Sequence, residues 1–215
     1  MKKSVALVND SRKDLIDFLE NNLKLVFGDS ININRYFINE INDNDIINDD
    51  VILVMSVERL DKIINNILDK KKVIVVRRTF REDKIYNLLS LPQGTNVLIV
   101  NDSDETTLET ISLFYKIGVT NIRPIPYMND NNYKNIKIAI TPGVPEKVPS
   151  FISDIFDLGH RYIDISTFIE IINLLQIDSK EIQSNLVKYS EEIISLDTGI
   201  KDKYKELFLK IEELD

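Results

Sequence analysis

A seven-residue pattern occurs twice in this chain, and it constrains the fold more than any other feature. Residues 5–11 read VALVNDS and residues 97–103 read VLIVNDS, so five of the seven positions are identical. Each copy is an apolar, valine-rich run followed at once by Asn-Asp-Ser, which is typical of a buried strand that turns into a helix. A strand-to-helix turn that recurs 92 residues later predicts two similar lobes.

Short apolar runs alternate with segments of helical periodicity along both halves. The predicted strands are residues 5–8, 31–37, 51–55, 73–76, 97–100, 121–126, 136–140 and 161–165. The predicted helices are residues 15–26, 60–68, 108–115, 148–158 and 168–175, with Gly118 and Gly159 as stop signals after two of them. Strands that alternate with helices pair in parallel through right-handed crossovers. The sequence therefore predicts an α/β fold with a doubly wound parallel sheet, Rossmann- or flavodoxin-like, in each lobe.

The expected domain organisation is two lobes followed by a long helix. A turn signal at residues 92–95 (PQGT) marks the boundary between a first lobe, residues 1–93, and a second lobe, residues 94–178. Residues 179–215 carry apolar side chains at alternating steps of three and four, with one offset beside Gly199. This helix either folds back on the lobes or forms a coiled coil that leads to another domain or a partner subunit. The second interpretation predicts a homo-oligomer and a longer parent protein.

Composition excludes several classes of function. The 215 residues carry a formal net charge of −8 and a pI near 4.9, which disfavours direct contact with nucleic acid. The chain has no cysteine, so disulfides and thiolate chemistry are excluded. The first apolar run is too short for a signal peptide or a membrane span, which predicts a cytoplasmic protein without membrane contact. No motif for a cofactor or a metal is present.

Ligands of open α/β sheets bind beyond the carboxyl ends of the strands. That rule nominates four groups of candidate ligand-binding residues: Asn9, Asp10 and Ser11; Ser56 with Arg77 and Arg78; Asn101, Asp102 and Ser103; and Thr141, Pro142 and Gly143.

Each group also has a purely structural interpretation. The Asp and Ser residues stand where helix N-caps belong, so capping competes with ligand contact. Arg77 and Arg78 suit an anionic ligand, but surface pairing with acidic neighbours would also explain them. Thr141, Pro142 and Gly143 form a weak phosphate loop or simply a tight turn. The only histidine, His160, is expected at a helix end, and no catalytic constellation is recognisable.

A resemblance adds a functional expectation. Residues 97–103, 109–111 (ETI), 125–127 (IPY), 138–143 (IAITPG) and 158–167 (LGHRYIDIST) resemble the N-terminal sensory region of clostridial sigma-54-dependent transcriptional activators. The broad organisation is similar to the receptor domain of the propionate-catabolism activators. The resemblance implies a regulatory domain that senses a small polar or anionic effector between its lobes and signals through its C-terminal helix. DNA and sigma-54 RNA polymerase would be contacted by ATPase and DNA-binding modules that this chain does not contain.

Three other functions compete with the sensor. A phosphorylated receiver is disfavoured because Ser56 follows residues 51–55 where a phosphoacceptor Asp is expected. An enzyme with a two-lobed cleft lacks a nucleophile–base pair, so a non-enzymatic role is expected. A scaffold that dimerises through residues 179–215 without binding a ligand stays open.

Overall fold

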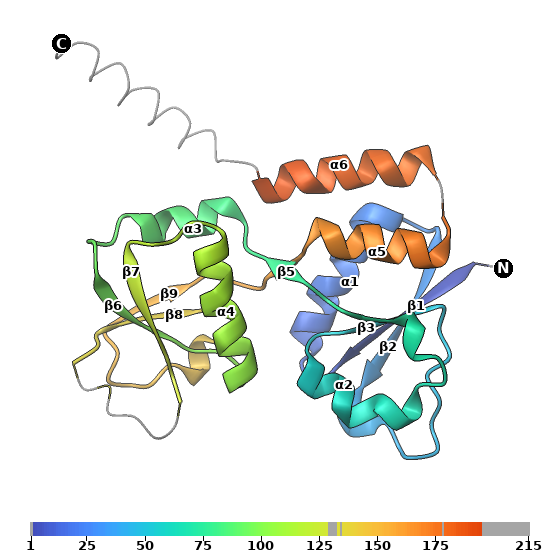
Figure 1. The fold of residues 1–215 in the computed structure, drawn as a ribbon, viewed down its shortest axis with the longest axis horizontal. Helices are drawn as coiled ribbons and strands as arrows, with labels where there is room; N and C mark the ends of the chain where they lie inside the picture. Colours follow the sequence, from blue (N-terminus) through green and yellow to red (C-terminus); the bar gives the residue numbers. More distant parts are fainter. Residues whose placement is uncertain (1, 129–132, 134, 178, 195–215) are drawn as a thin grey trace, which may run out of the picture.

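The chain forms two α/β lobes joined by a short two-stranded ribbon, as the computed structural model shows (Figure 1). The structure describes residues 2–128, 133, 135–177 and 179–194. Each lobe contains a four-stranded sheet in which every pair of neighbouring strands is parallel. The predicted α/β class is confirmed, and the arrangement is consistent with a doubly wound, Rossmann- or flavodoxin-like fold.

The first sheet has the strand order β2-β1-β3-β4. Its elements are β1 (Lys3–Asn9), α1 (Lys13–Phe27), β2 (Ile31–Phe37), β3 (Val51–Val54), α2 (Val57–Ile63) and β4 (Val73–Val75). Short 3-10 turns follow at Ile38–Glu40, Ile64–Asn66 and Lys70–Lys72. Val5 and Leu7 pack in a core with α1, whereas Ala6 and Val8 pack in a second core on the other face. Both faces of the sheet are covered, which explains why the strand is apolar at every position rather than alternating.

The second sheet has the strand order β7-β6-β8-β9. Its elements are α3 (Glu82–Leu89), β6 (Thr95–Ile99), α4 (Asp104–Lys116), β7 (Ile122–Pro126), β8 (Ile138–Thr141) and β9 (Asp154–Asp157), with a 3-10 turn at Pro145–Lys147. Val97 and Ile99 pack with Phe114 of α4 in one core. Leu98 and Val100 pack on the opposite face with Tyr133 and other residues of the long connections.

The chain crosses between the lobes twice, and the two crossings pair as an antiparallel ribbon. They are β5 (Arg78–Thr79) and β10 (Tyr162–Ile163), with Ile163 opposite Arg78. After the second crossing, α5 (Ile165–Leu175) and α6 (Lys180–Ile194) return to the first lobe. Packing therefore groups the elements differently from the ranges 1–93 and 94–178: α3 packs in a core of the second lobe and α5 in a core of the first.

The described part of the C-terminal helix folds back. In α6, Ile182, Tyr189 and Ile193 are buried in the same core as α1 and α5. The Tyr189 hydroxyl donates to Asn22 Oδ1 at 2.6 Å, which fixes the helix on the first lobe. The continuation of the stripe beyond residue 194, including Gly199, lies outside the described residues. Within the described ranges, no helix is long and apolar enough to span a membrane.

The prediction of a helix at residues 148–158 was wrong. This segment begins as a loop and then forms β9, in which Ile155 pairs with Ala139 of β8. Pro149 stands in the first turn of the predicted helix, where proline is tolerated, so it does not explain the difference. The segment is extended because residues Asp154–Asp157 pair along β8 and complete the edge of the second sheet. Gly159 consequently follows a strand, and His160 lies beyond the carboxyl end of β9 rather than at a helix end.

Candidate functional site

The second copy of the Asn-Asp-Ser motif is internally satisfied. Ser103 is the N-cap of α4 and forms a reciprocal capping box with Thr106. Asn101 Nδ2 donates to the Thr106 carbonyl and to Thr110 Oγ1, both at 3.0 Å, and its Oδ1 accepts from the Asp102 N–H at 2.8 Å. The polar groups of Asn101 and Ser103 are used by the fold itself, so the capping interpretation describes this copy.

The first copy has the same letters but not the same bonds. Asn9 is 1% exposed, and neither atom of its amide has a hydrogen-bond partner. Helix α1 begins at Lys13 with Arg12 as its N-cap and no side-chain capping bond, so Ser11 does not cap it. Asp10 accepts a hydrogen bond from Arg59 Nε at 2.6 Å. A buried amide without partners is costly, which makes Asn9 a candidate for ligand contact.

Three arginines converge beside this orphan amide, and we call Arg59, Arg78 and Arg161 the arginine cluster. Their side chains are only 8%, 6% and 2% exposed. Arg78 Nη2 and Arg161 Nη2 both approach Glu109 Oε2 of α4, at 3.1 and 3.0 Å. Arg78 Nη2 also lies 3.4 Å from the Met55 carbonyl. The ribbon between the lobes thus supplies two guanidinium groups that face one carboxylate of the second lobe.

The strand register places Asn9 next to this cluster. Val8 pairs with Val54 in neighbouring parallel strands, so Asn9 and Met55 are the next residues along the two strands. The Met55 carbonyl is the one that faces Arg78. Adjacent strands are only about 4.8 Å apart. The orphan amide and the arginine cluster therefore share the carboxyl edge of the first sheet.

The electrostatics of the arginine cluster are unfavourable for its own positive charges. Burial, together with the charges of Arg161 and Arg59, lowers the pKa of Arg78 to about 9. Burial also lowers the pKa of Arg161, and Arg59 adds to this effect. Arg78 Nε and Arg161 Nη1 are buried without any hydrogen-bond partner. Three guanidinium groups have two directly paired carboxylates, Asp10 and Glu109, while Asp102 acts on Arg161 through its charge alone. Because Arg78 Nε and Arg161 Nη1 still have no partner, this edge of the sheet is short of acceptors.

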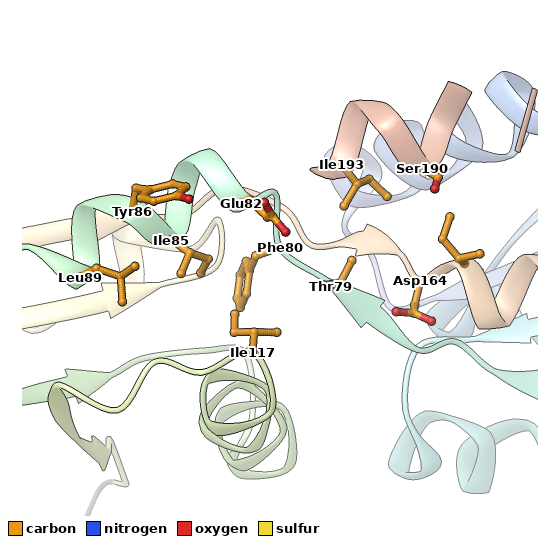
Figure 2. Close-up of a pocket in the computed structure, with 11 residues that line it drawn as sticks. Thr79, Phe80, Glu82, Ile85, Tyr86, Leu89, Ile117, Asp164, Ser190 and Ile193 are labelled. Atoms are coloured by element: carbon orange, nitrogen blue, oxygen red, sulfur yellow. The ribbon is translucent and has the colours of Figure 1, made fainter. Parts of the chain in front are cut away.

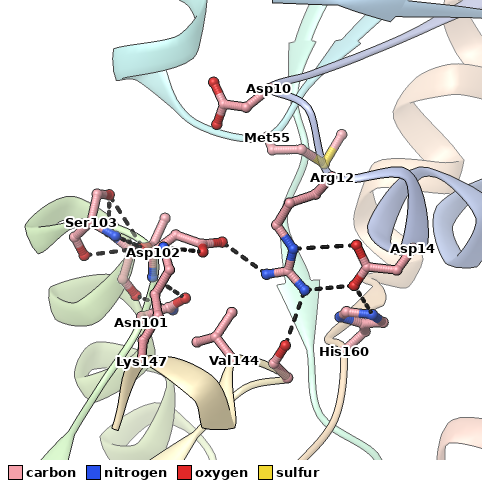
Figure 3. A network of polar contacts seen from close by, with 12 residues as sticks. Asp10, Arg12, Asp14, Met55, Asn101, Asp102, Ser103, Val144, Lys147 and His160 are labelled. Carbon is pink, nitrogen blue, oxygen red and sulfur yellow. Dashed lines mark hydrogen bonds and ion pairs between the residues drawn. The ribbon is translucent and has the colours of Figure 1, made fainter. Parts of the chain in front are cut away.

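A second polar network crosses the interface at its rim (Figure 3). Arg12 of the first lobe donates to Asp102 at 3.1 Å and to the Gly143 carbonyl at 3.0 Å, both in the second lobe. His160 Nε2 lies 3.1 Å from Asp14 Oδ2, and burial and the charge of Arg12 lower the pKa of that histidine. These contacts, rather than a helix dipole, account for His160.

A cavity of about 570 Å³ opens at this rim. It is lined from both lobes, by residues that include Ser11, Arg12, Asp102 and Lys147. A volume of this size can hold a small molecule. The cavity gives the interface a solvent-reachable opening on the side where the carboxyl ends of the strands meet.

The remaining predicted residues have structural roles. Ser56 caps α2 by accepting from the Arg59 N–H at 3.3 Å. Arg77 is half-exposed and pairs with Glu170 at 2.6 Å, away from the cluster. Thr141 is fully buried and accepts from the Val144 N–H, and Pro142 is buried beside it.

The backbone conformation and the neighbouring side chain of His160 require a glycine at position 143, so a bound phosphate is not needed to explain it. Its φ is +80°, and an added Cβ would lie 2.8 Å from His160 Nδ1. The segment of Thr141, Pro142 and Gly143 is therefore a tight turn from which only the Gly143 carbonyl reaches across the interface, toward Arg12.

Sequence reasoning missed Arg12, Arg59, Glu109 and Arg161. Arg12 directly follows the first Asn-Asp-Ser motif, which is a signal that could have been used. Arg59 lies inside a helix, and Glu109 and Arg161 are contributed by the other half of the chain. Only the two crossings between the lobes bring these side chains together, so no sequence spacing identifies them.

A second cavity, of about 380 Å³, lies on the opposite side of the ribbon (Figure 2). Figure 2 shows Ser190 and Ile193 of α6 on one side of it and Phe80 and Ile85 of the second lobe on the other. Its lining is mostly apolar. The last described turn of α6 therefore lies beside the ribbon, with side chains of the second lobe on the other side of the cavity.

Among the described residues, no group of three or more histidine or acidic side chains is arranged to hold a metal ion. Comparisons with protein-family models, with curated proteins and with solved structures gave no match.

Proposed function

We propose that this chain is a regulatory receptor that binds a small anionic effector between its lobes, at the arginine cluster and Asn9. The observation that carries the proposal is that four of the five described buried side-chain polar atoms without partners lie at this edge: Arg78 Nε, Arg161 Nη1 and both amide atoms of Asn9, with Asn121 Oδ1 the fifth. Such atoms are costly to bury unless a partner is supplied. An anion with acceptor oxygens supplies partners for the guanidinium groups and offsets their mutual repulsion.

Access to this site requires the lobes to move. Arg78, Arg161 and Asn9 are buried against the interface, while the ribbon of β5 and β10 connects the lobes by only two residues on each strand. A ligand that binds between the lobes would shift the equilibrium between open and closed arrangements by its different affinity for each. A hinge movement of the two lobes about the ribbon is sufficient to admit the ligand and then to enclose it.

The position of α6 connects such a movement to the C-terminus. This helix is fixed on the first lobe through Tyr189, while Ser190 and Ile193 line the hinge-side cavity against the second lobe. A rotation of the second lobe would change the contacts at the last described turn of α6. The resemblance of residues 96–176 to the sensory region of sigma-54-dependent activators agrees with this role, in which the chain reports effector binding to modules outside it.

The test is a thermal-shift titration of the purified chain with carboxylates, inorganic phosphate and matched neutral amides at constant ionic strength. A ligand that binds only the folded state stabilises it by roughly 2.7 kcal/mol at a hundredfold excess over its dissociation constant. We expect one anionic class to raise the melting temperature in a saturable way. If no anion does so in the wild-type chain, the proposal fails.

Two adjacent arginines provide a matched pair of variants. Arg78→Gln removes a cluster guanidinium and should abolish the response, whereas Arg77→Gln removes an exposed one and should preserve it. Arg161→Gln is a second cluster variant, and circular dichroism establishes that each variant is folded. Equal responses in Arg78→Gln, Arg161→Gln and the wild type would place the anion elsewhere.

A further inference from the structure

Glu109 holds an unusual position in the candidate site. Its side chain is 38% exposed, yet it is the carboxylate that two nearly inaccessible guanidinium groups share. It is carried by α4 of the second lobe, whereas Arg78 and Arg161 belong to or directly precede the strands of the ribbon. The contact is therefore made across parts that hinge motion would separate.

Glu109 accepts hydrogen bonds from only some of the guanidinium N–H groups at the site. Both arginine contacts use the same oxygen, Oε2, while Arg78 Nε and Arg161 Nη1 stay without partners. Arginine normally binds a carboxylate in a fork, with two parallel N–H···O bonds. A free carboxylate that is not tied to a helix can choose a position that serves more of these donors than Glu109 does.

Resting on the proposed function, we propose that Glu109 is an internal substitute for a carboxylate group of the effector, and that the effector displaces it. The ligand class is then a small carboxylate, because the structure already selects a planar carboxylate at this point. Displacement exposes no new buried charge, since the incoming group replaces the negative charge that leaves.

Displacement of Glu109 would also weaken the contacts between the two lobes. One helical turn before Glu109, the carboxylate of Glu105 accepts from the N–H groups of Val57 and Glu58 at 3.3 Å, across the interface to α2. Helix α4 therefore holds the two lobes together through two successive carboxylates. Removing one of them weakens the interface and frees the second lobe to move.

The experiment is chemical rescue with acetate. In Glu109→Ala the position is vacant, so sodium acetate should raise the melting temperature in a saturable manner relative to sodium chloride at equal ionic strength. Acetamide, which has the same shape without the charge, should not do so. The matched control is Glu170→Ala, which removes the carboxylate partner of the exposed Arg77 and should show no saturable response to acetate.

Glu109→Gln provides an independent measurement if the alanine variant is unstable. It keeps the size of the side chain but removes the competing charge, so we expect it to bind acetate roughly tenfold more tightly than the wild type. Acetate effects that are identical in Glu109→Ala, Glu170→Ala and the wild type would overturn the inference.

The two proposals fail separately. If an anion stabilises the wild type through Arg78 but with the same affinity in Glu109→Gln, the receptor function stands and the displacement of Glu109 is wrong. If neither the wild type nor either Glu109 variant responds to any anion, both are wrong.

Discussion

The same Asn-Asp-Ser motif stands at the end of β1 in the first lobe and just after β6 in the second, but its polar groups are hydrogen-bonded differently in the two lobes. In the second lobe, Asn101 makes three hydrogen bonds inside the turn and Ser103 caps α4. In the first lobe, the Asn9 amide has no partner and Ser11 caps nothing. The motif is thus a complete turn in one lobe and an incomplete one in the other. Equal residues at equal positions in a repeat do not imply equal roles, and the incomplete copy is the one to examine for ligand.

The largest expected difference between the copies concerns the two asparagines. Asn101→Ala removes three hydrogen bonds and leaves the buried Thr110 hydroxyl and backbone groups with fewer partners, so we expect a loss of about 2 kcal/mol of stability. Asn9→Ala removes only atoms that have no partner, and we expect a change within about 1 kcal/mol. Urea unfolding of both variants measures this difference. Equal losses would show that a partner of Asn9 exists in solution without added ligand.

The two serines sharpen the same comparison at the helix starts. Ser103→Ala breaks the capping box of α4 and should cost about 1 kcal/mol, the usual value for an N-cap. Ser11→Ala should cost almost nothing, because α1 has no side-chain capping bond. The midpoint of urea unfolding, at unchanged slope, is the measurement. A loss in Ser11→Ala comparable to that in Ser103→Ala would mean that the starts of the two helices are equivalent after all.

The sequence predicts a good part of this fold, and the reasons for its failures are physical. Among the described residues, the repeated motif and the apolar runs identify seven of the eight strands in the two four-stranded sheets. The signal is clearest for central strands such as β1 and β3, which are covered on both faces and are apolar almost throughout. The strand missed in these sheets, β9, has exposed Asp154 and Ile155 at the edge of its sheet and lacks that signature. The two-residue strand β5 of the ribbon was missed as well.

The candidate site was predictable only in part. The sheet-edge rule nominated Asn9 and Arg78, which the structure brings to the same edge of the first sheet, but it could not separate Arg78 from Arg77. Arg78 is buried in β5 of the ribbon, whereas Arg77, the residue before that strand, is half-exposed and pairs with Glu170. Glu109 enters the site from α4 of the second lobe, and Arg161 enters it from the residue before β10 of the ribbon. Their contribution depends on long-range packing, which a local sequence pattern does not reveal.

The smallest predicted effect concerns the aspartates of the two motifs and the pH dependence of the stability that Asp102 contributes. Asp10 pairs with Arg59 of its own lobe, whereas Asp102 accepts hydrogen bonds from Lys147 and, across the interface, from Arg12. Burial acts to raise the pKa of Asp102, but Lys147 and Arg12 outweigh it, so its pKa lies below the ordinary value of 3.8.

A carboxyl group whose pKa is lower in the folded state stabilises the fold above its unfolded pKa, and this stability is lost as the pH falls through the folded pKa. Asp102→Asn should therefore lower stability by about 1 kcal/mol at pH 7. The gap to the wild type should begin to narrow below about pH 4 and should close as the pH falls through the lower pKa of the folded state. Because Arg12 lies in the other lobe, the lost contact is one between lobes, and Arg12→Gln should reproduce part of the effect. Urea unfolding of the three proteins at pH 7 and at a series of lower values down to about pH 2 tests this. A gap that is constant with pH would show that the charge of Asp102 does not join the lobes. The other contacts between them, such as those of Glu105 and the bond from Arg12 to the Gly143 carbonyl, would then do so without it.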